Sequence, residues 1–255
     1  MNIHPTAIIE SGAQIAADVT IGAFAYIGKN VVIGPGNRIQ HHASVDGHTT
    51  LGESNTIFPY ACLGGQTQDL KYTGDRTGLS IGDHNIFREY TTIHTATKEG
   101  SVTKIGHHNA FLAYTHVAHD CTVGDHIIMS SLAALAGYVT LGNYVNIAWN
   151  SGVHQFCKVG DYAMLAASSK VIMDVLPFML AEGQPAKTRY FNKVNLQRHQ
   201  FSPEDIEHVK NIYRILFHSK YNHSEALEQL KQYRQISDVY EVVIRAIESS
   251  QRGFC

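Results

Sequence analysis

The chain has 255 residues, a formal net charge of −2 and a sequence pI near 6.8. This balance argues against general nucleic-acid binding, which needs a basic surplus. No apolar run approaches the ~20 residues that a transmembrane segment needs, and a regular repeat that begins at Ile3 argues against a signal peptide. The four cysteines form no CxxC pair and indicate a reducing compartment, so we expect a cytoplasmic protein.

An apolar side chain recurs at every sixth residue from Ile3 to Val171, and only Asp69, Asp75 and Glu99 break the series. A period of six fits neither the helical period nor a continuous strand, but it suits short strands separated by regular corners. Glycine often follows the aliphatic residue, which suggests that the corners need tight or left-handed backbone. The pattern predicts an all-β parallel β-helix whose aliphatic residues form one continuous core.

The pattern [LIV]-G-x-x-[small]-x resembles that of the hexapeptide-repeat acyltransferases. The resemblance implies a left-handed, three-sided helix with about 18 residues in each coil. Residues one coil apart are then expected to lie above one another at the strand spacing of roughly 4.8 Å.

Two segments interrupt the repeat, near 65–80 and near 95–104. Loops that leave a rigid solenoid are common places for binding residues. We interpret the first loop as a candidate binding element and the second, shorter loop as a solvated excursion. With both insertions included, the β-helix is predicted to cover 1–185.

Residues 186–255 are predicted to form a smaller α-helical C-terminal domain. Ser202 precedes a proline and two acidic residues, a pattern typical of a helix N-cap and first turn. Ser224 is predicted to cap the next helix, and a last helix is expected near 237–249. These helices would cover the open end of the β-helix, where unpaired backbone groups would otherwise invite aggregation.

His119 and Asp120 follow an inward-facing Val117 and are therefore expected at a corner. Counting one coil on from His119 reaches Gly137, and a second coil reaches Gln155, so the three residues are predicted to form one column. The column pairs a candidate general base with an unobstructed backbone N–H that could stabilise an oxyanion. Asp120 could orient the imidazole or stabilise its charged form.

The spacing His116-x-x-His119 also raises the question of a zinc site. Positions three apart on a strand point to opposite sides, so one corner would have to bring both side chains together. We therefore expect no metal.

Three segments resemble the signatures of the UDP-N-acetylglucosamine acyltransferases of lipid A biosynthesis: Gln68–Tyr72, His116–Gly124 and Val153–Cys157. The likeness covers nearly the whole chain. It implies transfer of a 3-hydroxyacyl chain from acyl carrier protein to the 3-position of UDP-N-acetylglucosamine, the first step of lipid A biosynthesis. It also implies a homotrimer with active sites between subunits and a reaction without a cofactor, since the donor is a thioester on the carrier protein.

The resemblance assigns roles to individual residues. His119 becomes the general base, Asp120 its partner and Gly137 the oxyanion donor, while Ala167 matches a small residue that limits acyl-chain length. Tyr138 departs from the pattern, because relatives usually carry histidine there. The substrate contacts implied by the resemblance are Gln68, Asp69, Lys71, His116, Tyr138, His154, Gln155, Asn192 and Arg198.

Several alternatives stay open. A related acyltransferase could act on a 3-amino sugar nucleotide, and a zinc hydratase or an inactive structural β-helix could share the scaffold. A related N-acyltransferase carries an extra N-terminal domain, which the immediate start of the repeat disfavours. The sequence leaves open the acyl-chain length and the surface that docks the acidic carrier protein, for which Lys170, Lys210 and Arg214 are candidates.

Overall fold

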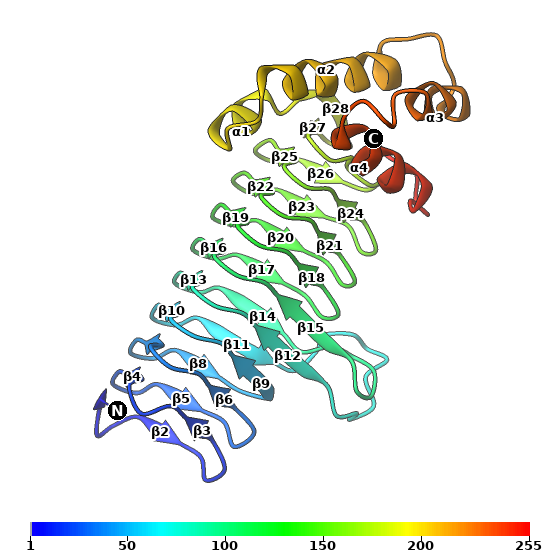
Figure 1. Cartoon of the computed structure of the whole chain (residues 1–255). Helices are drawn as coiled ribbons and strands as arrows, with labels where there is room; N and C mark the ends of the chain where they lie inside the picture. Colours follow the sequence, from blue (N-terminus) through cyan, green and yellow to red (C-terminus); the bar gives the residue numbers. More distant parts are fainter. Residues whose placement is uncertain (1) are drawn as a thin grey trace.

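The computed structural model describes residues 2–255 and is a long three-sided parallel β-helix with helices at its C-terminal end (Figure 1). Each side is one sheet, and successive strands of the chain belong to successive sheets. Most strands are very short, because the chain turns a corner after every strand.

The three sheets are named here in the order in which the chain enters them. Sheet A contains β1 (Asn2–Ile3), β4 (Thr20–Ile21), β7 (Arg38–Ile39), β10 (Thr56–Ile57), β13 (Ile86–Phe87), β16 (Ala110–Phe111), β19 (Ile128–Met129), β22 (Asn146–Ile147), β25 (Met164–Leu165), β27 (Met179–Gly183) and β28 (Ala186–Phe191). Sheet B contains β2 (Ile8–Ile9), β5 (Tyr26–Ile27), β8 (Ser44–Val45), β11 (Cys62–Gly65), β14 (Thr92–His94), β17 (His116–Val117), β20 (Ala134–Leu135), β23 (Gly152–Val153) and β26 (Lys170–Val171). Sheet C contains β3 (Gln14–Ile15), β6 (Val32–Ile33), β9 (His48–Leu51), β12 (Gly78–Ile81), β15 (Val102–Ile105), β18 (Thr122–Val123), β21 (Thr140–Leu141) and β24 (Lys158–Val159).

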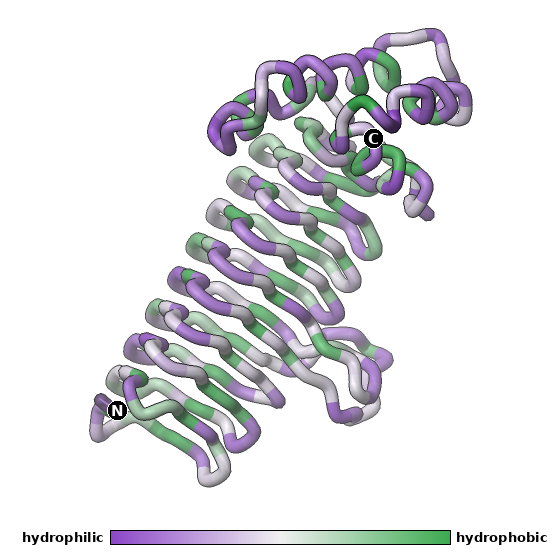
Figure 2. Tube along the Cα trace, in the orientation of Figure 1, coloured by the Kyte–Doolittle hydropathy of each residue, from purple (hydrophilic) through white to green (hydrophobic). Residues whose placement is uncertain are grey.

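The repeated apolar residues form the core. Ile57, Phe111 and Leu135 are fully buried, and the hydrophobic segments of successive coils follow one another along the molecule (Figure 2). Phe87 and Phe111 stack in adjacent coils with ring centroids 5.1 Å apart. Ile3 remains 37% exposed, because it lies in the first described coil and has a neighbour on one side only.

The strand register sets the length of each coil. Thr122 pairs with Thr140, which is the spacing that the resemblance implies for a regular coil. This regular spacing between paired residues is lost where the loops interrupt the repeat. Thr56 pairs with Ile86, and Ile86 pairs with Ala110, so both of these coils are longer than a regular one and differ from each other.

Most glycines that follow the repeated aliphatic residue do not adopt left-handed backbone, which corrects one part of the expectation. Left-handed backbone at the corners is instead adopted mainly by other residues, such as Asp120 and Tyr138, at φ of 60° and 62°. A β-carbon on Gly124 would lie 2.7 Å from the carbonyl oxygen of Gly142 in the next coil. Glycine is therefore needed there for close approach of backbones, and only Gly64 of this set has a positive φ.

The C-terminal segment begins with the antiparallel hairpin β27–β28, which extends sheet A beyond β25. The sequence-based boundary between 185 and 186 falls in the turn of this hairpin. The helices α1 (Lys193–Arg198), α2 (Pro203–Phe217), α3 (His223–Lys231) and α4 (Asp238–Glu248) follow and lie at the end of the β-helix (Figure 1).

The helix caps only partly follow the sequence patterns. Ser202 caps α2 as predicted and accepts the backbone N–H of Asp205. The prediction for α3 is wrong: Asn222 is its N-cap, in a capping box with Glu225, and Ser224 lies inside the first turn. Within residues 2–255, none of the helices has the length and apolar character needed to cross a membrane.

Candidate active site

Both insertions leave the β-helix at the corner between sheets B and C. The first connects β11 to β12 and the second connects β14 to β15, and the two loops lie together on one edge of the molecule (Figure 1). They are joined by the backbone N–H of Arg76, which donates to Glu99, and by the N–H of Gly100, which donates to the carbonyl of Arg76. His119 lies at the same corner, between β17 and β18.

His119 and Asp120 form a hydrogen-bonded pair. Nδ1 of His119 lies 2.8 Å from Oδ2 of Asp120, and the two side chains are only 13% and 8% exposed. A carboxylate can only accept, so Nδ1 carries the proton in this bond, and in the neutral imidazole Nε2 is the nitrogen that can accept. The predicted pairing of the two residues is present in the structure.

Gly137 lies directly above His119 in the next coil. The N–H of Tyr138 donates to the carbonyl of His119, and the N–H of Phe156 donates to the carbonyl of Gly137. The column of His119, Gly137 and Gln155 is therefore present as counted. The N–H of Gly137 itself has no partner within residues 2–255 and can bond a ligand.

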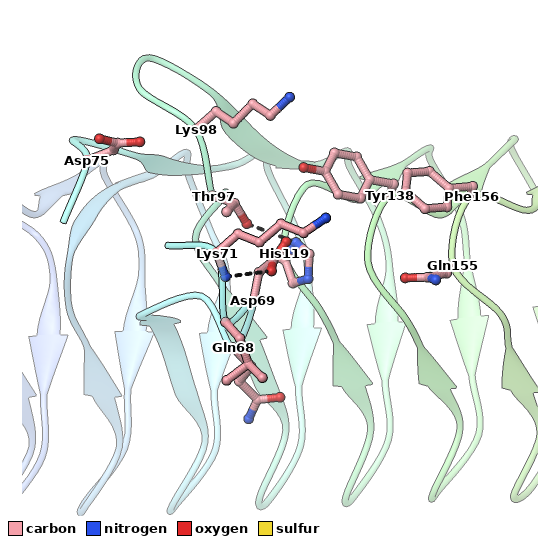
Figure 3. Close-up of a pocket in the computed structure, with 11 residues that line it drawn as sticks. Gln68, Asp69, Lys71, Asp75, Thr97, Lys98, His119, Tyr138, Gln155 and Phe156 are labelled. Carbon is pink, nitrogen blue, oxygen red and sulfur yellow. Dashed lines mark hydrogen bonds between the residues drawn. The ribbon is translucent and has the colours of Figure 1, made fainter. Parts of the chain in front are cut away.

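A cavity of about 720 Å³ opens above this pair, between the two loops and the next two coils (Figure 3). Several residues proposed as substrate contacts line it together with His119: Gln68, Asp69, Lys71, Tyr138 and Gln155. The structure adds Thr97, Lys98 and Phe156, which sequence reasoning missed. The interpretation of the second loop as a solvated excursion is thus wrong, because that loop supplies one wall of the cavity.

A usable signal for the second loop existed in the sequence. The apolar positions that precede the two interruptions, Leu63 and Ile93, occupy paired positions on neighbouring strands of sheet B. Counting corners rather than residues would have put both loops at the corner of His119.

Tyr138 forms part of the cavity wall. Its ring stacks on Phe156 with centroids 4.8 Å apart and meets the ring of His119 edge-on at 5.5 Å. Burial, followed by the carboxylates of Asp120 and Asp69, raises the pKa of Tyr138. The phenol therefore stays neutral and can donate a hydrogen bond, as an imidazole at this position could.

A second groove, of about 490 Å³, runs over the outer face of sheet B. His116 and His154 line it, together with Gly137 and the small residues Ala134 and Gly152. Burial, and then the nearby His94 and His119, lower the pKa of His116 to about 4. His116 is therefore neutral near pH 7, and its Nδ1 lies 2.8 Å from Oγ1 of Thr92.

The structure does not bring all predicted residues together in one chain. Asn192 is buried at the start of α1, where its side chain accepts from Asn195 and donates to the carbonyl of Tyr162. Arg198 is exposed at the end of α1, and Ala167 is exposed at the corner between β25 and β26. None of these three lines the cavity or the groove.

Cys121 follows the His–Asp pair but does not suit nucleophilic chemistry. It is fully buried, and burial raises the pKa of its thiol to about 12. Among residues 2–255, no three His, Cys, Asp or Glu side chains converge as metal ligands. His116 and His119 instead have separate partners, Thr92 and Asp120.

Curated relatives match this chain over almost its full length. Residues 174–255 match the family described as the second domain of UDP-N-acetylglucosamine O-acyltransferase, and 12–47 match the bacterial transferase hexapeptide, six repeats. The acyl-[acyl-carrier-protein]–UDP-N-acetylglucosamine O-acyltransferase of Syntrophobacter fumaroxidans is 39% identical over 99% of both chains. The enzyme of the same name from Thermodesulfovibrio yellowstonii is 42% identical over 99% of this chain and 98% of its own.

Solved structures lead to the same family. The UDP-N-acetylglucosamine acyltransferase of Francisella novicida superposes with a TM-score of 0.97 at 36% identity, over 99% of this chain and 93% of its own. That of Moraxella catarrhalis also gives 0.97, at 38% identity, over 100% and 99%. These matches confirm the predicted left-handed β-helix with a helical C-terminal part. The chain belongs to the UDP-N-acetylglucosamine O-acyltransferase family.

Proposed function

We propose that this protein transfers a 3-hydroxyacyl chain from acyl carrier protein to the 3-hydroxyl of UDP-N-acetylglucosamine, the first step of lipid A biosynthesis, in the cytoplasm. The observation that carries the proposal is the His119–Asp120 pair with Gly137 directly above the imidazole, where His119 lines both the cavity made by the two loops and the groove on sheet B. The names of the relatives supply the two substrates.

The reaction follows from this geometry. Nε2 of His119 accepts the proton of the sugar 3-hydroxyl, whose oxygen attacks the thioester carbonyl to form a new C–O bond. The N–H of Gly137 stabilises the negative oxygen of the tetrahedral intermediate, and Asp120 stabilises the imidazolium. The intermediate then loses its C–S bond, and the imidazolium returns the proton to the leaving thiolate. Each of these steps uses only side chains, backbone and the two substrates, so we propose a reaction without a cofactor.

The polar residues around the cavity suit a sugar nucleotide. Asp69 accepts the N–H of Lys71 at 2.9 Å, a contact within the first loop that fixes its shape beside His119 (Figure 3). We assign Asp69 and Lys71 to the sugar and phosphate region, because a cation suits the diphosphate and a carboxylate suits hydroxyl groups. Gln68, Tyr138 and Gln155 supply further hydrogen bonds.

The groove on sheet B suits the acyl chain. His116 and His154 lie at its polar end, while Ala134 and Gly152 leave room for methylene groups above the sheet. Ala167 lies shortly before Lys170, at the corner just beyond the groove. We propose that Ala167 contributes to the limit on chain length.

A homotrimer would complete the site. Asn192 and Arg198 lie outside the cavity in one chain, so their proposed contacts with the uridine diphosphate require a neighbouring subunit. Tyr60, Tyr90 and Tyr114 support such packing, because they form an exposed aromatic ladder along the corner between sheets A and B. Sedimentation of the full chain would report a trimer mass if this assignment is correct.

The central experiment compares His119→Ala with His4→Ala, a matched control in the exposed first coil. Mass spectrometry of products from a mixture of acyl carrier thioesters, with the 3-hydroxy and 3-amino sugar nucleotides, identifies both substrates at once. We expect an O-acylated product from wild type and His4→Ala, and none from a folded His119→Ala variant. Near-normal turnover in His119→Ala would contradict the mechanism. A separate test treats the wild-type protein with a chelator: loss of activity that added zinc restores would favour the hydratase-like alternative.

A further inference from the structure

A chain of hydrogen bonds connects both insertion loops to His119. Oγ1 of Thr97, in the second loop, lies 3.0 Å from Nδ1 of His119 and 2.9 Å from Oγ1 of Thr67, in the first loop. Thr67 also accepts the backbone N–H of Asp69 at 3.2 Å. Both threonines are buried, at 5% and 4% exposure. The contact between Thr97 and His119 is drawn in Figure 3.

The placement of hydrogens along this chain decides which nitrogen of His119 is the base. Nδ1 faces two groups: the carboxylate of Asp120, which can only accept, and the hydroxyl of Thr97, which can accept or donate. If Thr97 donated to Nδ1, the ring proton would move to Nε2, and His119 could no longer accept the substrate's proton. Thr67 offers Thr97 another acceptor, so the hydroxyl hydrogen of Thr97 can point away from the imidazole.

We propose that Thr67 and Thr97 are positioning residues that keep His119 in the tautomer with its proton on Nδ1. Thr67 accepts the hydrogen of Thr97, and Thr97 then shares the Nδ1 proton with Asp120 as a second acceptor. The two loops act on the base through this chain as well as on the substrate through the cavity wall. This inference rests on the proposed function, in which Nε2 accepts the proton of the sugar.

The proposal predicts unequal effects from two substitutions that break the same hydrogen bond. Thr67→Val removes the acceptor, frees the hydrogen of Thr97 for Nδ1 and lowers kcat by about tenfold or more, since a general base in the wrong tautomer fails. Thr97→Val removes the competing donor itself, so the Asp120 contact still selects the tautomer and kcat falls by only about two- to threefold. The double variant should return to the level of Thr97→Val. Thr97→Ser should behave like wild type.

If the threonines only anchor the loops, the same variants give a different result. Thr67→Val and Thr97→Val would then be equivalent, and the loss would fall on KM for the sugar nucleotide, because Asp69 and Lys71 would be displaced. Equal kcat values for the two single variants would overturn the proposal. Thr122→Val, on an exposed position of sheet C, is the matched control for a threonine-to-valine change.

A readout independent of turnover separates this proposal from the proposed function. Nitrogen-15 NMR of the histidine-labelled protein at pH 8.5, with His119 identified by its loss in His119→Ala, reports which ring nitrogen is protonated. We expect Nδ1–H in wild type and a mixture with Nε2–H in Thr67→Val. If the spectra show only Nδ1–H in both wild type and Thr67→Val, the positioning role is refuted, even if both proteins have full transfer activity. If wild type acylates neither sugar nucleotide, the proposed function fails while this test of the tautomer still applies.

Discussion

The imidazole of His119 occupies the space where residue 137 would carry a side chain. A β-carbon built on Gly137 would lie 2.7 Å from Nε2 of His119 and 2.5 Å from Cε1, closer than real carbon atoms approach. The bare glycine therefore lets the His119 ring pack directly against the backbone of residue 137, whose N–H has no partner within residues 2–255. In the proposed mechanism, one coil of spacing puts the base for the sugar hydroxyl next to the N–H that stabilises the oxyanion of the thioester.

Gly137→Ala should abolish transfer while the protein still folds. The added methyl group forces the His119 ring away from its position, so we expect kcat to fall by at least about 100-fold. The steady-state rate and the thermal midpoint measure the two effects separately. Gly152→Ala is the stability control, because its β-carbon would meet nothing within 4 Å. A turnover within a few-fold of wild type in Gly137→Ala would show that the contact has no role in catalysis.

The vertical column at this corner could be counted from sequence because the coils above His119 are regular. From Thr122 through Thr140 to Lys158 each pairing spans one regular coil, so Gly137 and Gln155 fall where the count puts them. In the coils that precede His119, counting by regular coil length fails, because the two coils that carry the loops are longer than a regular coil and differ in length. Residues from these preceding coils, such as Thr97, therefore could not be assigned to the site by counting regular coils.

The position of the helical segment sets a second limit on sequence reasoning. Asn192 and Arg198 come from the helical segment, whose position relative to the coils depends on tertiary contacts such as that of Asn195 with the carbonyl of Tyr144. No period in the sequence encodes that contact. The cap of α3 is a different case, because Asn222 and Ser224 are both good caps by residue type, but only Asn222 has a glutamate three residues later, Glu225, which completes a capping box.

Lys98 should contribute to binding of a phosphate group. Its side chain is an exposed cation on the second loop, at the rim of the cavity (Figure 3). Lys98→Ala is expected to raise KM for the sugar nucleotide by about three- to tenfold with little change in kcat, and added salt should reduce the difference by screening.

The matched control for Lys98 is Lys104→Ala, on an exposed position of β15 outside the cavity. A rise in KM for the acyl carrier protein instead would assign Lys98 to the phosphodiester of the carrier's prosthetic arm. Unchanged KM values for both substrates would rule out a role in binding.

His116 should make the stability of the protein depend on pH. Its pKa is about 4 in the folded protein, against an ordinary value of 6.5, because burial disfavours the charged ring. The unfolded chain therefore binds more protons between these values, and the free energy of unfolding should fall as the pH drops from 6.5 towards 4. If the pKa shift acted in full, it would change the free energy of unfolding by about 3 kcal/mol. Because solvent reaches the groove, we expect a smaller change of about 1–2 kcal/mol.

Urea unfolding at pH 7 and pH 4.5 measures this dependence in wild type and in His116→Gln. The variant keeps a polar side chain but has no titrating ring, so its stability should fall less between the two pH values. His94 should preserve part of the dependence in both proteins, because burial also lowers its pKa. An equal loss in wild type and variant would place the titrating group elsewhere.

Gly152 should set the width of the groove on sheet B. It pairs with Ala134 and Lys170 on the neighbouring strands and lines the groove, and a β-carbon added to it would meet no protein atom within 4 Å. Gly152→Val should therefore leave the fold intact and shift selectivity towards shorter acyl chains. Competition between acyl carrier thioesters of different length, read by mass spectrometry, gives the ratio of kcat/KM values directly.

Ala167→Gly is the companion variant. Comparing it with Gly152→Val shows which residue lies beside the acyl chain and which lies at the end of the chain. If the chain follows the groove past Gly152 and stops near the corner at Ala167, removing the methyl group there should favour longer chains, by about 1 kcal/mol for each added methylene that becomes buried. Gly152→Val should then impair every chain that is long enough to pass position 152, whereas Ala167→Gly should change only the longest ones. Longer chains accepted by Gly152→Val, or a preference unaffected by either substitution, would mean that the acyl chain does not lie on sheet B.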